Sequence, residues 1–551
     1  MRARGLLIAA AVASAAALAG SAGADVPAPR QISVDPFTNP SGQHETAVEP
    51  DSFAFGNTVV AVFQLGRIAA GGASGIGWAR STDGGRTWTS GVLPALTVHA
   101  TPPGPYSRAS DPVIAFDRVH GTWLASVLAL REAAGTSISS LVTSRSADGS
   151  SWSAPVVTAP EQGQLFMHDK NWIVCDNGRS SPHAGRCYVT WTHSEGGTLA
   201  VSSSSDGGQT WSAAVTVPAA RGTGWQPIVR PDGTLVVVYM TGGTIEAVRS
   251  RDGGRTFAAP AVVASQRFAR VPGMRAPSLP SVEIDAAGRA VAAWHDCRFR
   301  VRCSTNDIVY ASSRDGTRWT RVRRIRTAPR LGGLNHFVPG LAVDASTRGA
   351  RTRLAAAFYV LTPRGCTLGS CLVQPWFVSS RDNGRTWSAP EALAPAQRPD
   401  AYPNSNGGRF AGDYISTSFT HGGTAVPVFA AASAPFDGRF HQGVFATAVP
   451  PLPAAARPLS LGRPRVAPRR PRPGRRVIVS APLAGPSDDA HVRCSATRAR
   501  VLRAGLAGGR AVCRLRVRAG ARVRGTITVT TPDADATRRF ALRVQRSQTG
   551  S

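Results

Sequence analysis

The stretch Ser81-Thr-Asp83-Gly-Gly85-Arg-Thr87-Trp88 decides the fold, because its pattern recurs along the chain. An Asp side chain accepts hydrogen bonds from backbone N–H groups shortly after it, and Gly supplies the positive φ that closes a hairpin. Ser and Thr hydroxyls bond further loop groups, and the aromatic ring can lock the turn onto the layer beneath. Each residue type in the stretch therefore has a structural role in a turn between two strands.

This turn pattern occurs six times. Its aspartates are Asp83, Asp148, Asp206, Asp252, Asp315 and Asp382, spaced 65, 58, 46, 63 and 67 residues apart. Self-similarity at a period of this size is typical of repeat architectures. We therefore interpret these six aspartates as structural and not as catalytic residues.

A second pattern shares the period: a strand that often starts with Pro, a turn, and then a very apolar strand. Units of this kind begin near Glu49, Asp111, Lys170, Pro227, Pro280, Pro339 and Asp413. A few short strands cannot bury both faces alone, but stacking such units into a closed ring does so. The sequence predicts an all-β propeller over residues 30–450, with seven blades favoured and six possible. Residues 30–34 could supply the outer strand that the last unit lacks.

The six repeats resemble the Asp boxes, or BNR repeats, of the sialidase superfamily. The resemblance covers residues 30–450 and implies a sialidase-like propeller with exoglycosidase activity. Sialidases of this superfamily clamp the substrate carboxylate with three arginines, the first in an F-R-I-P motif, and use a Tyr–Glu pair and an Asp acid/base. Here the first inner strand reads Val48-Glu49-Pro50-Asp51, without that arginine. The R-x-P-S-L match is at Arg275, and the resemblance offers Arg298 and Arg409 as further candidates.

The starts of the innermost strands should converge on one mouth of the propeller channel. A pair of carboxylates there suits glycoside hydrolysis, one as acid and the other as nucleophile or base. We predict Asp111, with Glu49 or Asp51, as the catalytic residues. The predicted substrate-binding residues are Arg275, Lys170 (the only lysine), Asp169, His168, Gln226, His336 and Asp413. The alternatives are that these acids cap strand starts, or that they hold Ca²⁺, although no EF-hand-like spacing supports a metal.

The first 24 residues have the pattern of a secretory signal peptide: a basic start, a short apolar stretch and an A-x-A site before Asp25. Export predicts that the eight cysteines form local disulfides. The predicted pairs are Cys175–Cys187, Cys297–Cys303, Cys366–Cys371 and Cys494–Cys513. No C-x2-C spacing or histidine cluster accompanies them, so a zinc site is not expected. No stretch is long enough to predict a transmembrane helix.

The composition changes after residue 450. A Pro/Arg-rich linker is expected over residues 451–476, followed by a basic Ig-like sandwich over residues 477–551. From Pro451 to the end the chain holds 22 Arg and 4 Asp, which is a large part of its net charge of +30. Arg514, Arg516 and Arg518 alternate with apolar residues and should share one face. That face is either a solvated exterior or a contact surface for an anionic envelope polymer; nucleic acid is not an expected partner of an exported chain.

Two functions follow from these patterns. The first is a secreted exoglycosidase that acts on extracellular glycans at the channel mouth. The second is a non-catalytic glycan- or protein-binding propeller, held at the cell envelope by its basic C-terminal domain. No nucleotide-binding loop, zinc signature or serine-hydrolase elbow is present, and no cofactor is expected.

Overall fold

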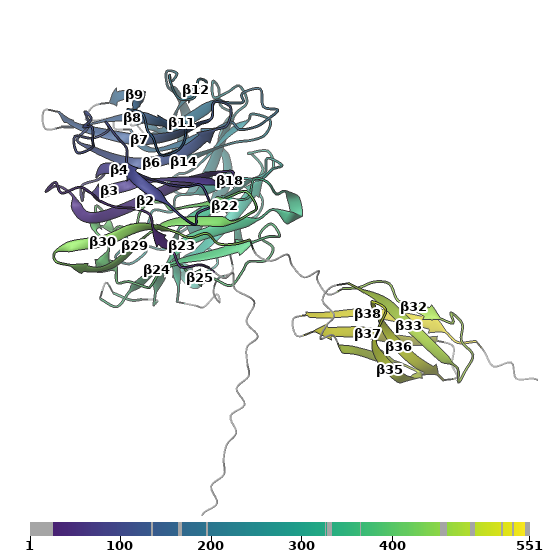
Figure 1. Ribbon diagram of the computed structural model, residues 1–551. Coiled ribbons are helices and arrows are strands. Elements are labelled where there is room, and N and C mark those ends of the chain that lie inside the picture. Colours follow the sequence, from purple (N-terminus) through teal and green to yellow (C-terminus); the bar gives the residue numbers. More distant parts are fainter. Residues whose placement is uncertain are drawn as a thin grey trace, which may run out of the picture. The chain divides into compact units, whose positions relative to one another are not determined.

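A computed structural model describes residues 26–545 except 134–135, 163–167, 194–196, 326, 328–332, 364, 368, 452–459, 485–490, 519–521 and 532–533. The chain divides into two compact units, one ending at Pro451 and the other beginning at Leu452. Both are built almost entirely of strands (Figure 1). The predicted signal peptide lies outside the described residues. No helix in the described part is long and apolar enough to cross a membrane.

The first unit is built on a ring of inner strands. These are β2 (Gln43–Phe55), β6 (Arg108–Asp117), β10 (Asp169–Cys175), β14 (Thr223–Val229), β18 (Ser281–Ile284), β22 (Asn335–Val343) and β28 (Ser416–Phe419). Each inner strand contacts the next one in the chain, and β28 contacts β2. The ring is therefore closed, and its strands surround a central channel, as in a β-propeller.

Each inner strand begins an antiparallel group that continues outward, and seven such groups follow one another in the described part of the chain. The second strands are β3 (Thr58–Arg67), β7 (Thr122–Ala133), β11 (Cys187–His193), β15 (Leu235–Met240), β19 (Ala290–Asp296), β23 (Leu354–Thr362) and β29 (Ala425–Phe436). The third strands are β4 (Ala73–Ser81), β8 (Thr136–Ser146), β12 (Thr198–Ser204), β16 (Thr244–Ser250), β20 (Asp307–Ser313), β24 (Leu372–Ser380) and β30 (Arg439–Ala446).

Most of the outer strands are shorter than the strands that they pair with. The outer strands are β5 (Thr89–Val92), β9 (Val156–Gln162), β13 (Val215–Arg221), β17 (Ala261–Ser265), β21 (Arg323–Arg324), β25 (Glu391–Ala392) and, in the last group, β1 (Arg30–Gln31). A small hairpin of β26 (Asn404–Ser405) and β27 (Gly408–Arg409) precedes β28. The described part of the unit also contains short 3-10 helices at η2 (Val301–Cys303), η3 (Gly349–Arg351) and η4 (Pro399–Ala401).

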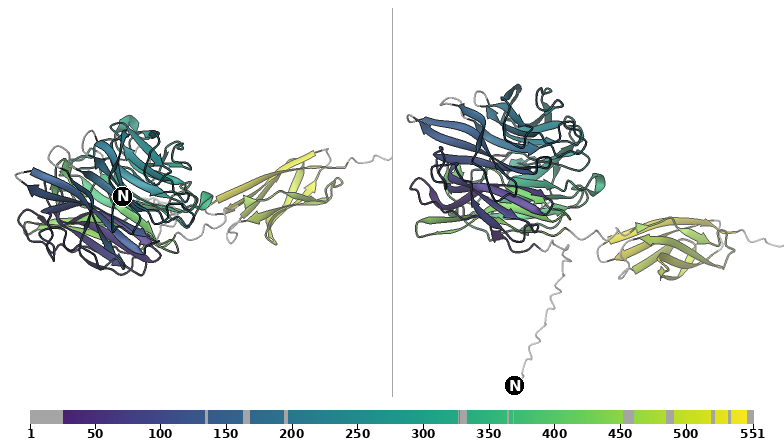
Figure 2. Two further views of the ribbon diagram at one scale, coloured as in Figure 1. Left: turned by 90° about the horizontal axis from the view of Figure 1, so that it is seen from above. Right: turned by 45° about the horizontal axis from the view of Figure 1, so that its top comes forward.

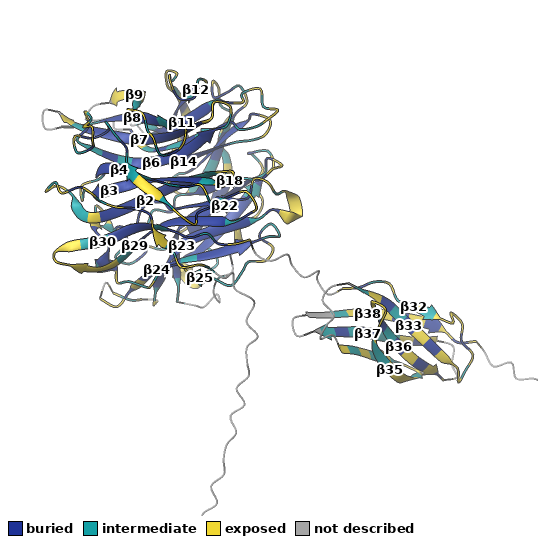
Figure 3. Ribbon diagram, in the orientation of Figure 1, coloured by how far each residue is buried: buried dark blue, intermediate teal, exposed yellow. Residues whose placement is uncertain are grey.

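The beginning of the described chain closes the last strand group. Arg30 and Gln31 pair antiparallel with Ala446 and Phe445 of β30, as predicted for residues 30–34. In Figure 2 the N-terminal strands, in purple, lie beside the green strands of the last group. The strand interiors are dark blue, and so buried, through most of the unit (Figure 3). Apolar clusters between neighbouring groups form the core, so each group is stabilised by the next one.

The Asp-box turns adopt the predicted role. In the first, Ser81 Oγ donates to Asp83 Oδ1 at 2.8 Å and accepts the Gly85 N–H at 2.9 Å. Asp83 also accepts the Thr87 N–H at 3.0 Å. Gly85 has a φ of +90°, and a Cβ there would lie 3.0 Å from Val426 in the neighbouring group. Glycine is therefore required both by the backbone conformation and by the close approach.

The second unit consists of two sheets around one apolar core. One sheet holds β31 (Ser460–Leu461), β32 (Arg465–Ala467), β33 (Arg476–Ala484), β35 (Ala499–Ala507) and β36 (Arg510–Val517); the other holds β34 (His491–Ala496), β37 (Arg522–Thr531) and β38 (Ala534–Arg543). Since β31 and β32 pair with β33, residues 460–467 are part of the sandwich. The expected linker over 451–476 therefore ends before residue 460.

All four predicted disulfides are present: Cys175–Cys187, Cys297–Cys303, Cys366–Cys371 and Cys494–Cys513. Cys494 lies on β34 and Cys513 on β36, so this bond joins the two sheets of the sandwich. The other three are local bonds within the first unit. No free cysteine is found among the described residues.

Candidate functional site

The starts of the inner strands carry a shared irregularity. In β2, β6 and β10 the pairing with the second strand shifts register, between Val48 and Asp51 in β2 for example. Within these bulges Glu49, Asp111 and Lys170 have φ values of 53°, 47° and 52°. A side chain at such a bulge is redirected relative to the regular strand, and non-glycine residues adopt this conformation only where the surrounding structure holds them. The bulges thus present three charged side chains at the same level of the ring.

These side chains meet Asp413, which precedes β28, in one ion cluster. Lys170 Nζ lies 2.8 Å from Asp413 Oδ2, 3.2 Å from Asp111 Oδ1 and 3.5 Å from Glu49 Oε1. All four side chains are largely or fully buried. Strands from four different groups therefore contribute to one cluster at the centre of the ring, as the convergence of the strand starts predicted.

Arg275 extends this cluster. Its Nε and Nη2 donate to the two carboxylate oxygens of Asp413 at 2.9 and 2.6 Å, a bidentate pair. The Arg275 guanidinium also lies over the Phe410 ring, 5.0 Å from its centroid. The Arg67 guanidinium lies 4.4 Å from the same centroid. Phe410 thus holds two arginines beside the acids of the cluster.

The cluster separates the pKa values of its acids. Burial would raise the pKa of Asp413, but Lys170 and Arg275 hold it below its usual value. Burial raises the pKa of Glu49 to about 7, with Lys170 opposing this rise and Asp111 adding to it. Burial alone would lower the pKa of Lys170, but the surrounding carboxylates raise this pKa well above its usual value. Carboxyl groups with such different proton affinities are a property of acid–base sites.

A cavity of about 480 Å³, here called the arginine cavity, opens beside this cluster. Its charged and polar lining includes Glu49, Gln64, Arg67, Arg108, Asp111, His168, Asp169, Lys170 and Arg275. Gln64 Oε1, Arg67 Nε and His168 Nδ1 are buried without a hydrogen-bond partner among the described residues. Buried polar atoms are normally bonded, and each one left without a partner costs about 1–3 kcal/mol. The charged and polar side chains that line this cavity make it suited to a polar ligand.

A second cavity of about 570 Å³, here called the loop cavity, is lined by the segment between β17 and β18. Asp169, Lys170 and Arg275 line both cavities, so the two meet along these side chains. Asp169 is exposed at this junction. Desolvation by the surrounding protein, with the negative charges of Asp111 and Asp413, raises the pKa of Asp169 to about 6. Asp169 can thus carry a transferable proton near neutral pH.

Asp51 and Gln226 line a different cavity, which follows the channel between the inner strands and has a volume of about 530 Å³. Asp51 Oδ2 accepts the Ile114 N–H at 2.9 Å, and Gln226 Oε1 accepts the Val282 N–H at 2.5 Å. Burial raises the pKa of Asp51 to about 7, and that of Glu283 in the same cavity to about 8. Because Asp51 lies outside the arginine cavity, it does not form the expected pair with Asp111.

Three further candidates do not line the arginine cavity or the loop cavity. His336 is buried and both ring nitrogens have partners, Asn306 O at 3.0 Å and Thr327 Oγ1 at 2.9 Å. Arg298 is bonded to Asp296, with Nε 2.9 Å from Oδ1. Arg409 lines neither cavity, but its backbone pairs with the Arg275 segment. The structure therefore gives His336 and Arg298 structural contacts instead of the expected binding roles.

Two arginines of the arginine cavity, Arg67 and Arg108, were absent from the sequence prediction. Arg67 ends β3, and Arg108 begins β6. In an antiparallel hairpin the end of the second strand lies beside the start of the first, as the Gln43–Arg67 pairing shows. A polar residue at a second-strand end was thus the available signal for Arg67, and for Arg108 the signal was its place at the start of an inner strand.

No family model and no curated protein matches the chain. Among solved structures it is similar to the Hadza microbial sialidase Hz136, with 15% identity and a TM-score of 0.38 over 59% of this chain and 65% of that one. The NanB sialidase from Streptococcus pneumoniae has 12% identity and a TM-score of 0.35 over 76% of this chain and 71% of that one. A PL25 ulvan lyase has 10% identity and a TM-score of 0.43 over 78% and 96%.

The chain thus spans somewhat less than two thirds, 65%, of the length of the Hadza sialidase. The likeness concerns the fold, and the site must be judged on its own residues.

Proposed function

We propose that the protein is a secreted glycoside hydrolase that removes a terminal sugar from an extracellular glycan. The arginine cavity holds the sugar, and hydrolysis takes place beside Asp169 and Asp111. The observation that carries the proposal is a cavity of about 480 Å³ that is lined by the carboxyl groups of Asp111 and Asp169 together with several arginines. Sugar hydroxyls can both donate and accept hydrogen bonds, so a sugar can bond such carboxylates and guanidinium groups.

Asp169 is the proposed general acid. It is exposed where the two cavities meet, which is the position of a bond between a sugar in one cavity and a leaving group in the other. Asp111 is the proposed nucleophile or base, because it lines the arginine cavity and its carboxylate lies 3.2 Å from the Lys170 ammonium group. Both oxygens of Glu49 already accept hydrogen bonds, from Gln64 and the Asp413 N–H. Glu49 is therefore a positioning residue in this proposal.

A panel of fluorogenic glycosides, with sialosides and uronides included, tests the proposal on the purified mature protein. Release of the fluorophore from one glycoside is the expected result. If the folded protein released no fluorophore from any glycoside of the panel, the proposed hydrolysis of a terminal sugar would be contradicted. The panel includes acidic sugars because Arg67 and Arg108 line the cavity.

The pH dependence of turnover should reveal Asp169. A general acid must be protonated, so kcat should fall as pH rises through its pKa of about 6. At pH 8 the protonated fraction, and kcat with it, should be roughly 100-fold below the low-pH limit. The measurement is kcat from pH 4.5 to 8.5 on the best fluorogenic substrate. In Asp169→Asn this inflection should be lost; a wild-type profile that is level from pH 5 to 8 would exclude the assignment.

A glycan-binding propeller without turnover is the second candidate. The observation that favours it is Lys170, whose charge is surrounded by the carboxylates that hydrolysis would use. In this case the basic C-terminal unit would hold the protein at an anionic envelope polymer. There, strand pairing aligns Arg476, Arg516 and Arg500 in one row of exposed side chains. Deleting residues 451–551 should then release the protein from envelope fractions, and unchanged fractionation would contradict this role.

A further inference from the structure

We propose that the loop cavity is a binding site for the second sugar of the substrate, the one next to the bond to be cleaved, and that this sugar carries an anionic group. Phe268 and Arg270 are the residues that select it. The inference rests on the proposed function, because it places the bond over Asp169, at the junction of the two cavities. The inference adds to the proposed function that the enzyme prefers a leaving-group sugar with an anionic group.

Phe268 supplies an apolar surface to the cavity. Its side chain is 46% exposed, although it belongs to a buried-core residue type. The ring packs edge-on against buried His295, with 5.7 Å between ring centroids and an angle of 86° between the planes. The ring is therefore held in place while much of its surface stays open. A fixed, exposed aromatic ring in a polar cavity is suited to packing against the C–H face of a sugar.

Arg270 supplies a positive charge that no described residue neutralises. Its backbone carbonyl accepts Asn335 Nδ2 at 3.5 Å, but its exposed guanidinium forms no ion pair within the described part of the chain. Arg275, in the same cavity, is by contrast bound to Asp413 through both carboxylate oxygens. Arg270 is thus the side chain of this cavity that can pair with an anionic group, a carboxylate or a sulfate, on the bound sugar.

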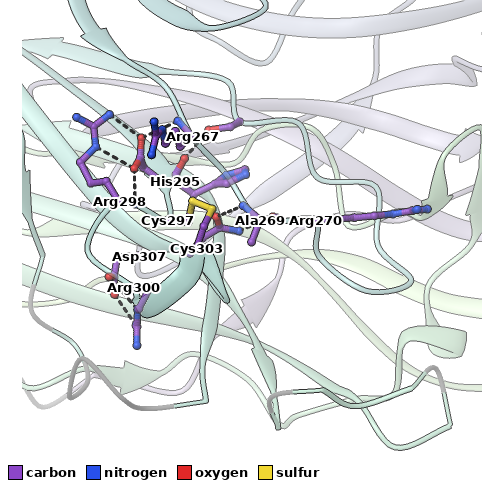
Figure 4. Close-up of a disulfide and its surroundings, with 12 residues drawn as sticks. Arg267, Ala269, Arg270, His295, Cys297, Arg298, Arg300, Cys303 and Asp307 are labelled. Atoms are coloured by element: carbon purple, nitrogen blue, oxygen red, sulfur yellow. Dashed lines mark hydrogen bonds and ion pairs between the residues drawn. A yellow bond between two sulfur atoms is a disulfide. The ribbon is translucent and has the colours of Figure 1, made fainter.

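The segment that carries Phe268 and Arg270 is fixed at several points. Ala269 exchanges two hydrogen bonds with Asn306, at 2.7 and 2.8 Å. Arg267 O accepts the N–H of Cys297, which forms a disulfide with Cys303 (Figure 4). Figure 4 also shows the Arg270 side chain extending away from this disulfide. The binding surface is consequently preorganised, which lowers the entropic cost of holding a ligand.

The far end of the segment is fixed as well. Arg409 N donates to Gly273 O at 2.9 Å, and Arg275 N donates to Arg409 O at 2.9 Å. Phe268 of the loop cavity and Arg275 of the ion cluster thus lie on one segment, which hydrogen bonds fix near both ends. A sugar in the loop cavity therefore lies between a fixed apolar wall and the proposed general acid.

The test compares two substrates that share the terminal sugar found in the glycoside panel. One is its glycosyl fluoride, whose leaving group cannot reach the loop cavity. The other is an oligosaccharide in which the second sugar is a uronate. For the oligosaccharide, Phe268→Ala and Arg270→Ala should each lower kcat/KM by about tenfold. For the fluoride, both variants should match the wild type.

Matched controls are Phe436→Ala, an exposed aromatic residue, and Arg255→Ala, an exposed arginine; neither lines the two cavities. Both should leave the two substrates unaffected. Equal losses on fluoride and oligosaccharide, or no loss on either, would overturn the proposal. A wild-type preference for an oligosaccharide with a neutral second sugar would overturn its anionic part.

A separate outcome identifies failure of the proposed function itself. If neither substrate is hydrolysed, binding is measured instead, on an array of uronate- and sulfate-bearing oligosaccharides. Loss of binding in Phe268→Ala and Arg270→Ala, but not in the controls, would support the anionic-sugar site in a protein without turnover. Absent binding, or equal binding by variants and wild type, would overturn it.

Discussion

Asp111→Asn should reduce kcat by roughly 1,000-fold or more, because an amide can neither attack the sugar as a carboxylate nor accept a proton as a base. Asn has nearly the same size and shape as the buried Asp111 side chain that it replaces. Lys170 keeps two carboxylates within 3.5 Å, those of Asp413 and Glu49, so the cluster retains paired charges. The loss should therefore appear in turnover and not in folding. The measurement is kcat on the best substrate, beside the unfolding midpoint.

Glu283→Gln is a suitable control, since this acid lines the channel cavity and not the arginine cavity. It should leave kcat within a few fold of the wild type. An Asp111→Asn protein with wild-type turnover would remove this residue from the mechanism. Equal losses in both variants would indicate that any change to the channel acids disturbs the site, and would also contradict the assignment.

Lys170→Met should destabilise the first unit by about 3–5 kcal/mol at neutral pH, because it leaves buried carboxylates without their central cation. Asp413 keeps Arg275, but Glu49 and Asp111 lose their nearest positive charge. Burial raises the pKa of Glu49 and Lys170 opposes that rise, so in the variant Glu49 should bind a proton more tightly than in the unfolded chain. The destabilising effect of Glu49 is therefore present at neutral pH and is relieved as pH falls through its raised pKa.

Denaturant unfolding at pH 7.5 and at pH 4.5 tests this prediction. All twelve Trp residues precede residue 451, so Trp fluorescence reports the first unit alone. Arg398→Met is the matched control, because it breaks an exposed ion pair with Asp400 and should cost less than about 1 kcal/mol. A loss in Lys170→Met that is small, or equal at both pH values, would show that the cluster does not depend on the lysine.

The residues at the starts of the inner strands were predicted from the sequence only in part. Glu49, Asp111, Lys170 and Asp413 were predicted to meet because a ring of repeats brings equivalent positions together, and they do meet. Asp51 was assigned to the same group, but it lies after the bulge at Glu49 and lines another cavity. A bulge changes the direction of the side chains that follow it, so alternation along the strand does not give the position of Asp51.

Other parts of the site depended on contacts between distant segments. Arg67 and Arg275 lie on the same Phe410 ring although the three residues belong to separate strand groups. The exposed Phe268 is fixed by His295 and by the braced segment around it. Neither arrangement follows the repeat, because each is set by contacts between segments that are far apart in the sequence.

The sequence by itself determined the repeating turn, the all-β propeller, a closing strand within residues 30–34 and the four disulfide pairs. These features depend on local turn chemistry and on a period that is visible along the chain. Only the tertiary structure decided which acids share a cavity, which arginines join them and how the proton affinities of Glu49, Asp169 and Asp413 diverge. The physical reason is that desolvation and charge–charge interactions depend on distances between strand groups, which the spacing of residues along the chain does not specify.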